Sequence, residues 1–220
     1  NSHVRESIDE DQWRQALLRE LDYWGERTKG RPLTTLFFGG GTPSLMSPQT
    51  VEALIDKACQ IWSPENLEIT LEANPNSIDL KKFKAFAHAG VNRVSVGIQS
   101  LDPDVLKFLG RTHSKDEAIR AIEIARQTFD RYSFDLIYAR PDQTWDMWEK
   151  ELMKALPLVG EHMSLYQLTI VPQTAFYTAY QRGDWKLPSE EMQALLYQNT
   201  NSLLKSHGLN AYEVSNYAKP

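Results

Sequence analysis

The sequence predicts an α/β fold in which parallel strands alternate with helices. Short runs of β-branched and aromatic residues, of which 33–38 is the first, are each followed by a stretch with apolar residues at helical spacing. Successive runs lie a few tens of residues apart, which leaves room for one helix between two strands and favours parallel neighbours with right-handed crossovers. Two closures fit this order, an open doubly wound sheet and a partial barrel.

Capping residues and helix-ending glycines set the expected boundaries. Helices are expected at about 7–25, 48–62, 79–90, 102–110, 114–129, 144–159, 174–182 and 189–207. Strands are expected at about 33–38, 67–73, 93–98, 132–138, 163–170 and 212–215. Most of the helices follow a residue whose side chain can cap the first turn: Ser7, Ser47, Asp79, Asp102, Ser114 and Thr144.

The composition is that of an ordinary globular protein. Of 220 residues, 41% are hydrophobic and 24% charged, and the net charge is −5 with scattered basic residues, which argues against a nucleic-acid groove. No apolar run approaches the ~20 residues of a membrane span. The single cysteine, Cys59, excludes a disulfide framework or an all-thiolate metal site within this chain, and a buried structural role is expected for it. A cytoplasmic setting is therefore expected.

The stretch 33–44 is the first candidate for a ligand-binding segment. Leu33–Phe38 is typical of a buried strand and runs directly into Gly39–Gly41. Glycines adopt positive φ cheaply and let a ligand approach the backbone, and a helix capped by Ser47 follows. Taken alone, the glycines are more typical of a tight strand-to-helix turn.

The glycine spacing helps to choose between the two closures. An open doubly wound sheet would normally carry a nucleotide fingerprint after its first strand. The spacing Gly39-x-Gly41-x-x-Ser44 lacks the third glycine of G-x-G-x-x-G, and no Gly-Lys-Ser/Thr follows. This favours the barrel.

Polar residues stand at or near the C-terminal ends of the predicted strands. In βα barrels this rim is where ligands bind, so these residues predict a pocket for a polar, multiply charged small molecule. They are Glu72, Gln99, Asp135 and Thr169, with Arg111 on the loop after the third strand.

Each of these residues also has a simpler interpretation. Glu72 is also consistent with a solvent-facing strand residue, and Arg111 with a surface pair to Asp104 or Asp116. Asp135 is harder to dismiss, because apolar residues flank it and an unpartnered buried carboxylate is costly. We therefore expect Asp135 to meet a cation or a ligand.

Five motifs occur in a fixed order along the chain. Together they resemble the radical S-adenosylmethionine (SAM) proteins of the coproporphyrinogen-oxidase-like family, and within it the heme-chaperone branch. The resemblance covers essentially the whole chain. The motifs are Phe38–Ser44, Leu71–Pro75, Ser95–Ser100, Leu109–His113 and Phe134–Tyr138.

The resemblance implies a partial (β/α)6 TIM-like barrel of the radical SAM type, formed by residues 1–210, with 211–220 beginning a further C-terminal region. In that family a C-x3-C-x2-C loop holds a [4Fe–4S] cluster and, in this branch, runs into a sequence like Asn1–His3. We therefore expect the cluster loop and the first strand to lie upstream, and the branch's heme motif to follow Pro220. The chain itself would then supply no metal ligand and no catalytic residue.

The resemblance also implies how SAM is held. The glycine loop would line the methionyl end, an arginine would pair with the carboxylate, and acidic and amide groups would bind the ribose hydroxyls. An aspartate would complete the polar shell, with an aliphatic residue and a threonine against the adenosine. The implied residues are Gly40, Gly41, Thr42, Arg111, Glu72, Gln99, Asp135, Ile137 and Thr169.

The implied function is that of a heme chaperone that binds SAM, a [4Fe–4S] cluster and heme, and passes heme to an acceptor protein. Three alternatives stay open: an oxygen-independent coproporphyrinogen III oxidase, another radical enzyme on this barrel, and a phosphate-ligand barrel without a cluster. The motif Glu72–Pro75 and the start Asn1–His3 favour the chaperone branch.

One departure concerns the loop after Tyr138. Where the family usually has Gly-Leu-Pro, this chain has Ala139–Pro141, which is expected to place the cation of Arg140 near the rim. None of the five histidines is expected to bind heme; a solvent-facing position is expected for each, including His113 on its loop.

Overall fold

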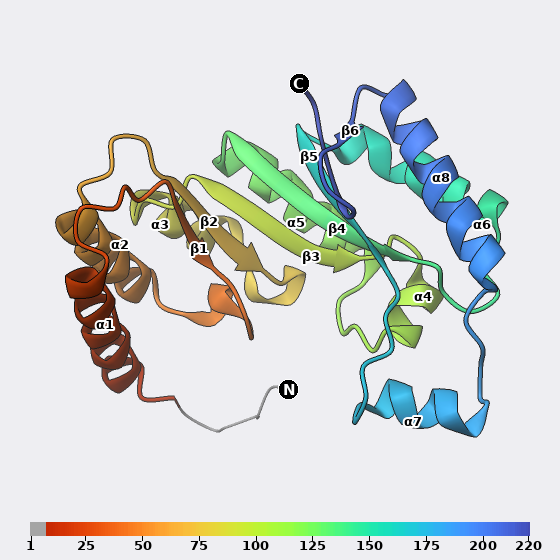
Figure 1. Ribbon diagram of the computed structural model, residues 1–220, viewed down its shortest axis with the longest axis horizontal. Helices are drawn as coiled ribbons and strands as arrows, with labels where there is room; N and C mark the ends of the chain where they lie inside the picture. The colour runs from red at the N-terminus through yellow and green to blue at the C-terminus, as the bar shows by residue number, and fades with distance from the viewer. Residues whose placement is uncertain (1–7) are drawn as a thin grey trace. The chain divides into compact units, whose positions relative to one another are not determined.

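The computed structural model describes residues 8–220, in which helices and strands alternate along the chain (Figure 1). The chain divides into two compact units. The first comprises the described residues up to Val96 together with Ile119–Tyr132, and the second comprises Gly97–Ala118 together with Ser133–Pro220. Within the first unit the strand order is β1-β2-β3, where β1 is Thr35–Phe38, β2 is Glu68–Ala73 and β3 is Arg93–Gln99.

The first unit is built on parallel strands. β1 pairs with β2, and β2 pairs with the first part of β3, all in parallel register. Helices connect these strands, so the expected alternation of helices with parallel neighbouring strands is confirmed. The elements are α1 (Glu10–Arg27), β1 (Thr35–Phe38), η1 (Pro43–Leu45), α2 (Pro48–Trp62), β2 (Glu68–Ala73), η2 (Pro75–Ser77), α3 (Leu80–His88) and β3 (Arg93–Gln99).

Helix α2 begins as the sequence predicts. The Ser47 side chain accepts a hydrogen bond from the Thr50 amide (3.3 Å), and Pro48 occupies the first helical position. Its apolar side chains at helical spacing are buried. Cys59, on the same helix, is half-buried rather than fully buried as expected, because it lies at the margin of that apolar stripe.

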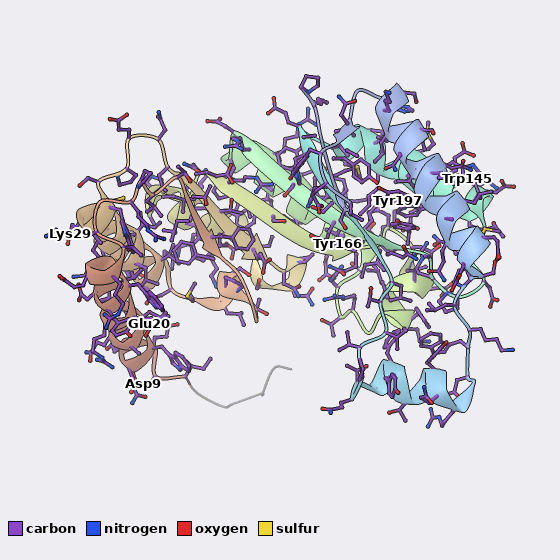
Figure 2. The ribbon with its side chains drawn as sticks, in the orientation of Figure 1. Asp9, Glu20, Lys29, Trp145, Tyr166 and Tyr197 are labelled. Atoms are coloured by element: carbon purple, nitrogen blue, oxygen red, sulfur yellow. The ribbon has the colours of Figure 1, made fainter. Side chains whose placement is uncertain are left out.

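Asp9 stands at the start of helix α1 (Figure 2). It caps the helix, because its carboxylate accepts from the Gln12 amide at 2.9 Å. The expected cap, Ser7, and the motif Asn1–His3 lie outside the described residues. Gly25 is the buried residue of α1. A Cβ there would lie 2.6 Å from Ile61 of α2, so the glycine permits the close approach of the two helices.

The prediction of a buried first strand is wrong. β1 covers only Thr35–Phe38, its burial alternates, and Phe37 is 57% exposed. The reason is that β1 stands at the end of the strand order and pairs with β2 on one side among the described strands. Side chains on an edge strand alternate between a covered and an open face, which an apolar run cannot reveal.

The second unit pairs the main part of β4 with β5 in parallel and β5 with β7 antiparallel. Its core includes Trp148, which stacks on Tyr138 (5.4 Å between centroids) and donates to Thr200 Oγ1 at 2.8 Å. The remaining elements of the chain are α4 (Pro103–Phe108), α5 (Lys115–Thr128), most of which belongs to the first unit, β4 (Arg131–Tyr138), α6 (Trp145–Ala155), η3 (Leu156–Leu158), β5 (His162–Gln167), α7 (Ala175–Arg182), α8 (Glu190–Ser206), β6 (Asn210–Ala211) and β7 (Asn216–Ala218).

Two strand predictions in this unit are wrong at their ends. β5 stops at Gln167, so Thr169 lies on the following loop rather than at a strand end. The expected strand at 212–215 is the turn of a hairpin between β6 and β7, in which Tyr212 donates to the Asn216 carbonyl (3.2 Å). Aromatic and β-branched residues favour strands, but here the Glu213 side chain accepts from the Ser215 amide and closes a turn.

Candidate functional site

The glycine loop of the first unit owes its shape to left-handed backbone. Gly40 and Gly41 have φ of 79° and 60°, and no atom lies within 4 Å of a Cβ placed on either residue. Their role is therefore conformational, and the backbone they leave is exposed. Thr42 follows, half-buried, and its carbonyl accepts from the Leu45 amide (2.9 Å) as η1 begins.

Glu72 belongs to the same site. Its Oε2 accepts a hydrogen bond from the Gly40 amide at 3.1 Å, across 32 residues of sequence. A Cβ on Gly39 would lie 3.4 Å from that oxygen and 2.6 Å from the Phe37 ring. The solvent-facing interpretation of Glu72 is therefore wrong: the half-buried carboxylate is fixed against the glycine loop, and most of its acceptor capacity is left for other donors.

Gln99 and Asp135 meet in the second unit. The Gln99 side-chain amide donates to Asp135 Oδ2 at 2.7 Å, and the Gln99 backbone amide lies 3.4 Å from Asp135 Oδ1. Burial raises the pKa of Asp135 to about 6, although the Gln99 hydrogen bonds and the positive charge of Arg111 oppose that rise. The direct partner of Asp135 is thus an amide, which the sequence did not predict, and the expected cation, Arg111, acts on it only as a charge at longer range.

Gln99 itself has unusual backbone. Its φ is 65°, and the Ser100 amide donates to the Ile98 carbonyl at 2.8 Å, which makes the rarer, positive-φ form of the γ-turn. A non-glycine residue in left-handed backbone costs about 1–3 kcal/mol and is concentrated at functional sites. The strain supports the prediction that this strand end has a function.

The other predicted residues of this unit are placed less definitely. Arg111 is exposed, Ile137 is half-buried in β4, and the exposed Thr169 donates only to the Gln167 carbonyl (3.2 Å). The structure therefore brings Gln99 and Asp135 into contact with the charge of Arg111 nearby. It shows no such contact for Ile137 or Thr169 among the described residues, and their roles stay predictions.

Two expectations about the placement of side chains, those of Arg140 and His113, are wrong. Arg140 does not face the rim: it is 6% exposed and its guanidinium pairs with Glu151 of α6 at 2.5 Å. His113 is not solvent-facing: it is 3% exposed, and its Nε2 lies 3.0 Å from the Ile98 carbonyl. Each side chain points inward because its hydrogen-bonding partner is buried: Glu151 for Arg140, and the Ile98 carbonyl for His113.

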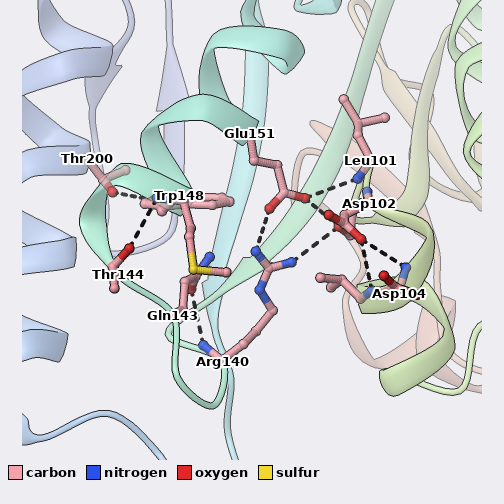
Figure 3. Close-up of polar contacts among 12 residues, drawn as sticks. Leu101, Asp102, Asp104, Arg140, Gln143, Thr144, Trp148, Glu151 and Thr200 are labelled. Carbon is pink, nitrogen blue, oxygen red and sulfur yellow. Dashed lines mark hydrogen bonds and ion pairs between the residues drawn. The ribbon is translucent and has the colours of Figure 1, made fainter.

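Sequence reasoning missed Glu151 entirely. It lies on α6 beside Ser100, accepts hydrogen bonds from the Ser100 hydroxyl and from the Leu101 amide (3.1 Å), and is 7% exposed (Figure 3). One signal could have revealed it: Glu151 stands three residues after Trp148 and next to Leu152, on the apolar face of the helix.

The described residues do not form a metal centre. Within 8–220, no group of three or more His, Cys, Asp or Glu side chains could hold a metal ion. In the same part of the chain, no helix combines the length and apolar character needed to cross a membrane.

The chain matches the model of the Radical SAM superfamily over residues 4–155, and it belongs to that superfamily. It is 39% identical, over its whole length, to "Radical S-adenosyl methionine domain-containing protein 1, mitochondrial" from Mus musculus, covering 50% of that protein. It is 35% identical to "Heme chaperone HemW" from Bacillus subtilis, again over its whole length and covering 59% of that protein. The chain thus spans only about half of the relatives it matches.

The fold is shared with a solved structure. Coproporphyrinogen III oxidase (HemN) from Escherichia coli, described as a radical SAM enzyme, aligns with a TM-score of 0.81 over 99% of this chain and 50% of its own, at 24% identity. At that identity the likeness establishes the fold alone. It confirms the predicted partial TIM-like barrel of the radical SAM type and removes the open doubly wound alternative.

Proposed function

We propose that this chain is the SAM-binding part of a heme chaperone, a cytoplasmic protein that binds heme and passes it to an acceptor protein. The observation that carries the proposal is the similarity along the whole chain to proteins named heme chaperone, in Bacillus subtilis and, at 37% identity, in Escherichia coli. The likeness to coproporphyrinogen III oxidase concerns the fold, so the oxidase is the less favoured alternative.

Membership in the superfamily implies SAM and a [4Fe–4S] cluster. The only cysteine of this chain, Cys59, is half-buried on α2, so the thiolates that such a cluster needs do not come from these residues. When bound, the cluster would supply the electron for SAM cleavage. The residues of this chain would bind and orient SAM.

The glycine loop of the first unit suits the amino-acid end of SAM. Gly40 and Gly41 offer exposed backbone carbonyls to the ammonium group, and the half-buried Thr42 follows them in the loop. Glu72, already held by the Gly40 amide, has acceptor positions left for a ribose hydroxyl. These carbonyls and the Glu72 carboxylate therefore provide the acceptors that the ammonium group and a ribose hydroxyl of SAM need.

The second unit, taken by itself, offers further groups of the kind that SAM can bind. Arg111 is exposed and can form a forked pair with the SAM carboxylate. Gln99 and Asp135 provide an amide and a carboxyl for ribose or adenine polar atoms, and Ile137 and Thr169 would lie against the adenosine. The raised pKa of Asp135 means that part of its population can donate as well as accept just below neutral pH.

The proposal is tested by SAM affinity of the full-length, cluster-reconstituted protein. Glu72→Ala removes a charged acceptor, and hydrogen bonds to charged groups contribute about 1.5–3 kcal/mol, so we expect the Kd for SAM to rise roughly 10- to 100-fold. Arg111→Ala should raise the Kd at least roughly 10-fold by the same reasoning. Isothermal titration calorimetry provides both values.

Two variants control for a general loss of charge. Glu65→Ala removes an exposed carboxylate of the first unit, and Arg120→Ala removes an exposed guanidinium of α5. Both should bind SAM as the unmodified protein does. Unchanged affinity in Glu72→Ala and Arg111→Ala would refute the assignment of these residues to SAM.

A further inference from the structure

The strained turn after β3 is held by more than its own backbone. Gln99 has a φ of 65° and sits between Ile98 and Ser100, whose carbonyl and amide close the γ-turn at 2.8 Å. The same residue carries both donors that reach Asp135, its backbone amide and its side-chain amide. Because both donors come from one residue, the turn geometry decides whether they reach the two carboxylate oxygens.

His113 fixes the carbonyl on the N-terminal side of the turn. Its Nε2 lies 3.0 Å from the Ile98 oxygen, which can only accept, so Nε2 carries the proton. The side chain is buried, and burial together with the Arg111 charge lowers the pKa of His113. The neutral ring therefore keeps this single tautomer at neutral pH.

Glu151 fixes the C-terminal side of the turn (Figure 3). One carboxylate oxygen, Oε1, accepts from both the Ser100 hydroxyl and the Leu101 amide (3.1 Å). The other, Oε2, receives Arg140 Nη2 at 2.5 Å, while Arg140 Nη1 lies 3.3 Å from Ser100 Oγ. The C-terminal side of the turn, Ser100 and Leu101, is thus bound to one buried ion pair.

A buried ion pair such as Arg140–Glu151 is not needed merely to stabilise the fold. Arg140 and Glu151 are each 7% exposed at the side chain, and the Arg140 guanidinium also lies 6.0 Å from the Trp148 ring. Replacing a buried ion pair by apolar side chains of similar volume is often neutral or stabilising. Apolar side chains could fill this space, but they could not bind the Ser100 hydroxyl and the Leu101 amide.

We propose that His113, Glu151 and Arg140 are positioning residues that hold Gln99 in its left-handed turn and so keep its amide groups on Asp135. The assignment of the Gln99–Asp135 pair to SAM rests on the proposed function, whereas the positioning role concerns the unliganded protein. None of the three residues needs to touch the ligand. The loop that departs from the family pattern at Ala139–Pro141 then has a specific task, because it supplies Arg140.

The test uses the double variant Arg140→Met/Glu151→Leu in the full-length protein. It removes one positive and one negative charge, so the net field at Asp135 changes little, and it keeps the buried volume. We expect a folded protein in which the titration midpoint of Asp135, followed by carboxyl carbon NMR, rises by about one pH unit, because the Gln99 donors that favour the charged form are lost. SAM binding should weaken about 10-fold.

Two further variants keep the test decisive. Ser100→Ala removes a single hydroxyl from the same network and should raise the Asp135 midpoint in the same direction even if the double variant does not fold. Thr200→Val removes the hydroxyl that accepts from Trp148, a buried contact of α6 outside the network, and should leave the midpoint and the SAM affinity unchanged. It controls for a general loosening of the second unit.

The outcomes separate the two claims. An Asp135 midpoint that stays in place or falls in folded variants overturns the positioning role, whatever happens to SAM. A midpoint that rises while SAM affinity is unchanged supports the positioning role and overturns instead the assignment of the Gln99–Asp135 pair to SAM.

Discussion

Replacement of Asp135 by asparagine should change how the stability of the protein depends on pH. An aspartate with a pKa of 3.8 when unfolded and about 6 when folded binds its proton more tightly in the folded state. Its contribution to stability is therefore fully present below pH 4 and is lost as the pH rises through 6. At about 1.4 kcal/mol for each pH unit, the loss amounts to roughly 3 kcal/mol in full.

Asp135→Asn removes this titration while keeping the shape of the side chain. The Gln99 amide can rotate so that its carbonyl accepts from the new amide, and the pair is preserved. We expect the free energy of unfolding of the unmodified protein, relative to the variant, to fall between pH 4 and 6 and to be level above pH 7. SAM binding should weaken in the variant, since asparagine carries no charge and one acceptor oxygen fewer.

The assay is urea unfolding of both proteins at half-unit steps between pH 4 and 8, followed by circular dichroism. Asp130→Asn, which removes an exposed carboxylate, is the matched control and should run parallel to the unmodified protein. A difference between the unmodified protein and Asp135→Asn that is constant over this range would refute the reasoning, because it would show that Asp135 titrates alike folded and unfolded.

Two further predictions concern the backbone and the buried ion pair. Gly41→Ala places a Cβ in open space, so no clash is expected, but the residue would keep a φ of 60° that alanine disfavours. The free energy of unfolding, measured in urea, should therefore fall by about 1–2 kcal/mol. A loss near zero would show that the backbone at position 41 moves out of this conformation and would contradict the prediction. Arg140→Met alone leaves Glu151 buried and uncompensated and should cost about 3–5 kcal/mol. Arg140→Met/Glu151→Leu leaves no buried charge and should cost less, about 1–3 kcal/mol, because the Leu101 amide and the Ser100 hydroxyl lose their acceptor. Equal losses in the two variants would contradict the ion-pair account.

Local signals in the sequence predicted most helices and strands correctly. Ser47 with Pro48, Asp79 and Thr144 are caps that act within a few residues, and α2, α3 and α6 begin directly after them. Polar residues at strand ends likewise marked Gln99 and Asp135, which the structure brings together. Features that depend only on residues nearby in sequence can be predicted before the fold is known.

The failures share a different physical origin. Phe37 is exposed because β1 is an edge strand, and Arg140 is buried because Glu151 neutralises it from another element. Neither fact is contained in the residues adjacent to Phe37 or Arg140, since both depend on which segments pack alongside. The same holds for the loop position of Thr169, where the strand ends earlier than the apolar run.

The most direct test of the proposed function measures heme and porphyrin chemistry in one preparation. The full-length protein, reconstituted with its cluster and supplied with SAM, is titrated with heme by absorbance and then incubated with coproporphyrinogen III under reducing, oxygen-free conditions. A heme chaperone should bind heme stoichiometrically, transfer it to an apo-acceptor protein and leave coproporphyrinogen unchanged. Decarboxylation of coproporphyrinogen without stable heme binding would contradict the account and assign the chain to the oxidase.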